Sequence, residues 1–76
     1  MLRVEFRILC ANRNTACDRA KSLMTDFEKL ENASPEKMYD YHGTRYFETV
    51  AKAKERRDEI FNKAGDDVKG IELAIG

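Results

Sequence analysis

Few side chains in this sequence could do covalent or metal chemistry. The chain contains two cysteines and one histidine. Cys10 and Cys17 are separated by six residues, and His42 lies far from both, so the ligands that a zinc site needs are not brought together. We therefore expect no metal site. We also expect both cysteines to be reduced, with Cys10 packed as a small apolar residue.

The sequence also lacks the short motifs of common enzyme classes. It has no Gly-x-Ser-x-Gly, no Walker-type glycine loop and no His-Glu-x-x-His. One histidine, with serines and cysteines scattered elsewhere, does not make a catalytic triad. We therefore expect no enzyme activity and no cofactor.

One short loop has the residues to bind an anion. Arg13 and Asn14 precede Thr15, which we expect to cap the start of a helix. Backbone N–H groups at such a start form the positive end of the helix dipole, and Arg13 adds a guanidinium. Arg13, Asn14 and Thr15 are therefore candidates for binding a phosphate or another anionic metabolite. The simpler interpretation is a capped helix without a ligand.

The elements that would position these residues follow from the hydrophobic period. Apolar residues alternate over 2–10 and again over 68–75, and they recur at helical spacing over 15–31 and from about 50 to 64. Residues 37–49 are typical of a β-hairpin. That order predicts an α+β, ferredoxin-like β-α-β-β-α-β domain, with a four-stranded antiparallel sheet and two helices on one face.

The predicted hairpin has one competing interpretation. A two-residue turn at His42-Gly43 would pair Tyr39 with Tyr46 across the two strands. The alternative is a long second helix from about residue 44, which would make the chain β-α-β-α-β. We favour the hairpin because tyrosine is more typical of strands than of helices.

Alternation within the predicted strands separates two sheet faces. The apolar set expected to face the helices comprises Leu2, Val4, Phe6, Ile8 and Cys10 of the first strand, with Met38 and Phe47 of the hairpin. The residues expected on the other face are Tyr39, Tyr41, Tyr46, Arg3 and Arg7.

These tyrosines and arginines are the first candidate contact surface. Tyrosine and arginine are favoured where proteins bind proteins, so we expect a protein partner, with a homodimer as one form of it. The alternative is single-stranded nucleic acid, because bases stack on aromatic rings interleaved with basic residues.

The second predicted helix carries another candidate contact patch. Lys54, Arg56 and Arg57 lie close together there, although acidic neighbours make a solvated, salt-bridged face the simpler interpretation. Arg57 also falls within the apolar stripe of the helix, where its stem would cover the edge of the core.

Charge and length restrict the classes of function. Fourteen basic and 14 acidic residues cancel, which argues against non-specific attraction to nucleic acids or membranes. No apolar run approaches the roughly 18 residues of a membrane span, and no export signal is recognisable, so we expect a cytoplasmic protein. The 76 residues predict a single domain, 1–76, for which self-association would add buried area. The function expected is therefore a small non-catalytic binding module, an adaptor or inhibitor of a larger assembly.

Overall fold

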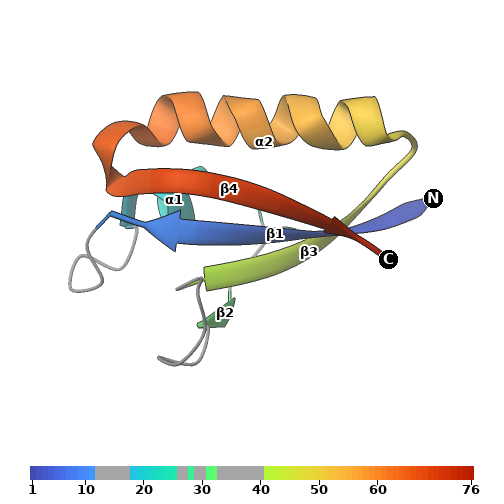
Figure 1. The fold of residues 1–76 in the computed structure, drawn as a ribbon, viewed down its shortest axis with the longest axis horizontal. Coiled ribbons are helices and arrows are strands. Elements are labelled where there is room, and N and C mark those ends of the chain that lie inside the picture. The colour runs from blue at the N-terminus through green and yellow to red at the C-terminus, as the bar shows by residue number, and fades with distance from the viewer. Residues whose placement is uncertain (12–17, 26–27, 29–30, 33–40) are drawn as a thin grey trace.

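A computed structural model describes residues 1–11, 18–25, 28, 31–32 and 41–76 of the chain. The structure is α+β, with an antiparallel sheet of three long strands and two helices (Figure 1). Along the chain the elements are β1 (Leu2–Cys10), α1 (Asp18–Leu23), β2 (Glu31–Asn32), β3 (Tyr41–Phe47), α2 (Val50–Ala64) and β4 (Val68–Ile75). The sheet order is β2-β3-β1-β4, in which the two-residue β2 pairs with β3.

Strand β1 lies between β3 and β4 and supplies more buried apolar residues than any other described element. It is antiparallel to both neighbours, with Phe6 opposite Gly43 on one side and opposite Leu73 on the other. Val4, Phe6 and Ile8 are completely buried, as the alternation predicted, because a strand turns every second side chain to the same face.

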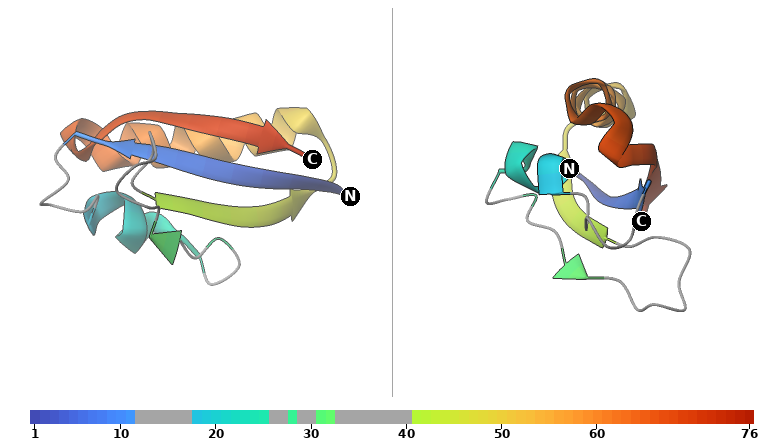
Figure 2. Two further views of the ribbon diagram at one scale, coloured as in Figure 1. Left: turned by 60° about the horizontal axis from the view of Figure 1, so that its bottom comes forward. Right: turned by 90° about the vertical axis from the view of Figure 1, so that its left-hand side faces the viewer.

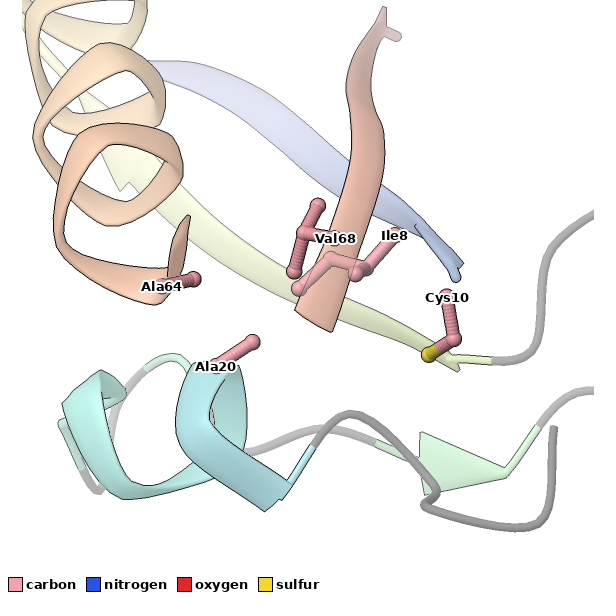
Figure 3. Close-up of a cluster of buried hydrophobic side chains, with 5 residues drawn as sticks. All are labelled: Ile8, Cys10, Ala20, Ala64 and Val68. Carbon is pink, nitrogen blue, oxygen red and sulfur yellow. The ribbon is translucent and has the colours of Figure 1, made fainter. Parts of the chain in front are cut away.

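Both helices cover that same face of the sheet. Ala20 of α1 and Ala64 of α2 pack with Ile8, Cys10 and Val68, and Figure 3 shows their side chains converging. Small alanines at these positions let the two helices approach the strands closely. A second cluster lies nearer the start of α2, where the Phe6 and Phe47 rings meet edge to face with centroids 5.8 Å apart.

Helix α2 has the bounds that the sequence predicted. The Thr49 hydroxyl caps it by accepting a hydrogen bond from the Lys52 N–H at 3.2 Å. Ala53, Ile60 and Ala64 are its buried residues. It ends at Gly65, whose φ of 64° is a conformation that glycine adopts without strain.

Strand β4 is confirmed over 68–75 and has an irregularity next to Gly70. Leu9 stands opposite Gly70, whereas Cys10 stands opposite Val68, so Lys69 has no partner in β1. This extra residue is a β-bulge, which bends the start of the strand.

The predicted hairpin turn is wrong, and so is its alternative. His42 and Gly43 lie inside a single strand, β3, opposite Arg7 and Phe6 of β1. The glycine serves the packing, because it presents no side chain against the buried Phe6 ring across the ladder. A long helix from residue 44 is excluded as well, because α2 begins at Val50.

The predicted helix over 15–31 is also too long. Helix α1 ends at Leu23, and Glu31–Asn32 pairs with β3 as a strand. One reason is local and the other is tertiary: the Thr25 N–H bonds to the carboxylate of Glu28, three residues further on, at 3.1 Å, and Arg56 of α2 donates to the Leu23 carbonyl at 2.9 Å. Those bonds replace the ones that would continue the helix. Residues 15–17, 26–27 and 29–30 lie outside the described residues.

Gly65, at the end of α2, and Gly70, in β4, provide a matched stability test. Gly65→Ala places a side chain at a φ of 64°, so we expect a loss of about 1–2 kcal/mol in the free energy of unfolding. Gly70→Ala is the control, because an added Cβ there meets nothing within 4 Å. Urea denaturation of both variants measures the difference. Equal effects would contradict the backbone assigned to Gly65.

Candidate functional site

A concavity of the described structure runs along the outer edge of β4, beside α2. Figure 2 shows β4 at one edge of the sheet with α2 beside it. One hollow of about 530 Å³ lies there, and a second of about 250 Å³ adjoins it, sharing Arg57, Gly70 and Ile71. We call this concavity the β4 groove and define it by Lys54, Arg57 and Phe61 of α2 and by Ile71, Leu73 and Ile75 of β4.

Helical and strand periods together build the groove. Lys54, Arg57 and Phe61 recur every three or four residues, so they share one face of α2, next to its buried stripe. Ile71, Leu73 and Ile75 alternate along β4 and share the face that the helices cover. Phe61 and Ile75 are 39% and 47% exposed, and β4 is the edge strand of the sheet formed by the described residues.

The groove is polar along its helix side. Lys54 is exposed and has no ion-pair partner among the described residues, and Arg57 bonds only to its neighbour Asp58, at 3.0 Å. Arg57 is the residue that the sequence placed at the edge of the apolar stripe, and its side chain is 30% exposed. Two of the three cations predicted as a contact patch, Lys54 and Arg57, therefore face this groove.

The third cation of that patch, Arg56, is directed into the molecule. Its Nε and Nη2 each donate to the Glu28 carboxylate at 2.7 Å, and its side chain is only 16% exposed. Arg45 of β3 donates to the same carboxylate at 2.6 Å. Glu28 itself is completely buried. Arg56 is thus part of an internal ion-pair network and is separate from Lys54 and Arg57.

The network fixes the ionisation of Glu28. Burial alone would raise the pKa of its carboxyl group, but hydrogen bonds from Arg56, the Thr25 N–H and Arg45 lower that pKa from 4.5 to about 2. The charge is therefore retained at neutral pH inside the protein. Sequence reasoning missed this glutamate, because on a charged segment it resembles any solvated acidic residue.

The sheet face turned away from the helices holds the other predicted contact residues. Tyr46 is 58% exposed and stands opposite Arg3 in the ladder between β3 and β1. Arg7 donates to Glu5 at 2.8 Å, and that hydrogen bond lowers the pKa of Glu5. His42 Nδ1 lies 3.9 Å from the same carboxylate. The face is therefore mixed in charge, with Tyr46 as its exposed ring among the described residues.

The three predicted tyrosines do not share that face through a hairpin. Tyr41 and Tyr46 belong to one strand and are five residues apart, and Tyr41 stands opposite Ile8 of the buried set. Tyr39 lies outside the described residues, as does Met38.

The predicted anion loop also lies outside the described residues, so Arg13, Asn14 and Thr15 stay predictions. Within the described part, no group of three or more metal-ligating side chains comes together. Neither described helix is long and apolar enough to cross a membrane.

Cys10 differs from expectation in its redox state. It is 5% exposed, as an apolar core residue would be, but it is disulfide-bonded rather than reduced. The sequence has one other cysteine, Cys17, outside the described residues. Disulfides are rare in reducing compartments, so the predicted cytoplasmic location gains no support from the cysteines.

Comparison with known proteins adds no assignment. No protein-family model matches the chain, and no match was found among curated proteins or solved structures.

The low pKa of Glu28 predicts how stability depends on pH. A carboxyl whose folded pKa lies below its unfolded value stabilises the fold above about pH 4.5, and this contribution is lost as the pH falls towards 2. A shift of this size corresponds to about 3 kcal/mol. We expect the difference in unfolding free energy between the wild type and Glu28→Gln to shrink over that range, measured by urea denaturation.

A direct readout is the carboxyl carbon shift of Glu28 in an NMR titration of the wild type. A midpoint near 4.5, or a stability difference that is independent of pH, would contradict the buried ion-pair network.

Proposed function

We propose that this chain is a non-catalytic binding module that acts through a protein–protein contact, as an adaptor or inhibitor of a larger assembly. The observation that carries the proposal is the β4 groove. It combines an edge strand, exposed apolar side chains and two cations on one rim, which is the composition of a contact surface rather than of an interior.

Exposure of apolar groups along the groove supports this assignment. Isolated apolar residues on a surface are ordinary, but exposed Phe61 and Ile75 line adjoining hollows together with the half-buried Ile71 and Leu73, and apolar side chains that gather in one concavity are typical of interaction sites. The cations at its rim are typical of interface edges, where charge steers association and fixes the partner's orientation.

We further propose that the domain is ferredoxin-like. The order β2-β3-β1-β4, antiparallel pairing throughout and two helices packed on the same sheet face support it. This assignment concerns architecture alone, because that fold serves many unrelated functions.

Protein binding is favoured over nucleic-acid binding by the composition of the opposite sheet face. In its described part, Tyr46 is accompanied by Arg3 and Arg7 but also by Glu5 and Glu72. A surface that stacks bases needs several rings and a positive field along the backbone path. The mixed charges are better suited to a second protein contact, centred on Tyr46.

A capture experiment with matched variants tests the proposed function. The tagged wild type is expected to retain a stoichiometric protein partner from a lysate of its source, identified by mass spectrometry. Lys54→Glu reverses a charge in the groove, and Tyr46→Ala removes the exposed ring of the opposite face. We expect one of these variants to lose about 90% or more of the captured partner, corresponding to about 1.4 kcal/mol or more.

Lys63→Glu is the control for the capture experiment. Lys63 is exposed on the same helix and pairs with Glu59 at 3.7 Å, away from the groove. Equal capture by the wild type, Lys54→Glu and Tyr46→Ala, or no specific partner at all, would contradict the proposed function.

A further inference from the structure

We propose that the β4 groove binds an extended acidic segment of another protein, which adds to the outer edge of β4 as a further strand. This inference rests on the proposed function and specifies the chemistry of the partner. Three properties of the groove lead to it: the direction of the β4 backbone groups, the apolar row beside them and the unmatched cations of α2 and β4.

Backbone hydrogen bonding shows which groups of β4 face outward. The Gly76 N–H donates to the Arg3 carbonyl at 3.1 Å, so Gly76 is directed at β1. In an antiparallel ladder, alternate residues direct both their N–H and C=O to the same neighbour. Counting back from Gly76, the residues that direct these groups away from the sheet are Ile71, Leu73 and Ile75.

This edge carries little of the protection usual for exposed strands. Proteins commonly block an edge with proline, with charged residues or with a bulge. The bulge at Lys69 bends only the start of β4, and from Gly70 to Ile75 there is no proline and a single charged residue, Glu72. Six consecutive residues of β4 are therefore suited to pairing with another strand.

The side chains of these same three residues, whose backbone groups point away from the sheet, define what the added strand must contain. Ile71, Leu73 and Ile75 belong to the sheet face that α2 covers, and they line the hollow of about 530 Å³. Alternate side chains of an added strand would enter this space between β4 and the overhanging Lys54 and Arg57. Apolar side chains at these alternate positions would extend the row that β4 begins.

Charge determines the remaining specificity. Lys54 and Lys69, near opposite ends of the groove, have no ion-pair partners in the described part of the chain. Arg57 has only Asp58. Glu72, the acidic residue of β4, alternates onto the other sheet face but still lines the larger hollow, and Asp58 lines the smaller one. Three lining cations therefore stand against two lining carboxylates, and Lys54 on the helix side has no ion-pair partner among the described residues, which favours carboxylates flanking the apolar positions of the partner.

A second copy of this chain fits the edge less well. Two-fold antiparallel pairing of β4 with β4 would bring the α2 helices of the two copies alongside each other. The cations Lys54 and Arg57 of one copy would then face the same cations of its mate, and like charges brought together oppose association. An acidic strand would instead place carboxylates beside Lys54 and Arg57, where a second copy would place like charges.

The test uses a synthetic peptide with blocked ends, Glu-Thr-Val-Thr-Ile-Thr-Glu, and the isotopically labelled full chain. This peptide places its apolar residues and carboxylates on one face of a strand and threonines on the other. NMR titration is expected to shift the amides of Ile71, Leu73 and Ile75 and to slow their hydrogen exchange. Those amides become protected only if they gain hydrogen bonds at the outer edge.

Matched peptides and variants separate charge from strand pairing. The peptide with both glutamates replaced by lysine should bind at least about tenfold more weakly. The Lys54→Glu variant should lower the affinity for the acidic peptide by about tenfold. Lys63→Glu should leave its affinity unchanged. Methylation of the peptide amides that face β4 should abolish binding, because it removes the donors of the new ladder.

Several results would overturn the inference. These are no shift at millimolar acidic peptide, equal binding of the acidic and basic peptides, or full binding by the methylated peptide. A dimeric mass together with protected Ile71 and Leu73 amides in the free protein would assign the edge to a second copy instead. The capture experiment does not use this peptide, so a partner that depends on Lys54 or Tyr46 would uphold the proposed function even if strand addition fails.

Discussion

The arrangement of the helices depends on one buried carboxylate. Glu28 accepts hydrogen bonds from Arg56 of α2, from Arg45 of β3 and from the Thr25 N–H, which joins the segment after α1 to two other elements. Removing one partner of a buried ion pair commonly costs about 3–5 kcal/mol, because a charge is left without compensation. In a chain of this length, whose whole stability is about 4–11 kcal/mol, that is a large share.

This network also explains where the sequence was informative. Period-two and helical patterns gave β1, α2 and β4 with their observed bounds, because each of these elements has a regular apolar face directed at one core. The hydrophobic pattern did not predict the end of α1 or the course of β3, which lie between β1 and α2 in the chain. The bonds of Glu28 and Arg56 end α1 early, and β3 passes through His42-Gly43 because β1, not a hairpin partner, pairs with it. The contacts of Arg56 with Leu23 and of β3 with β1 are long-range and leave no local signal, whereas the Thr25–Glu28 bond is local and belongs to a Thr-x-x-Glu pattern.

The candidate site was predictable to a similar degree. Sequence reasoning selected Lys54 and Arg57, because clustered cations on a helix can be recognised from spacing alone. It grouped Arg56 with them wrongly, because a one-residue step rotates the side chain towards Glu28. It did not find the groove, since that concavity requires knowing that β4 is an edge strand and that α2 lies beside it. The aliphatic alternation of β4 was read only as core.

The short length of α1 has a consequence for how the protein fluctuates. A six-residue helix is not stable alone, and here one of its last carbonyls, that of Leu23, is held by the Arg56 side chain. Partial opening that lifts α2 from the sheet therefore withdraws this anchor and weakens the end of α1. The bond couples the two helices, although 26 residues separate Leu23 from Val50.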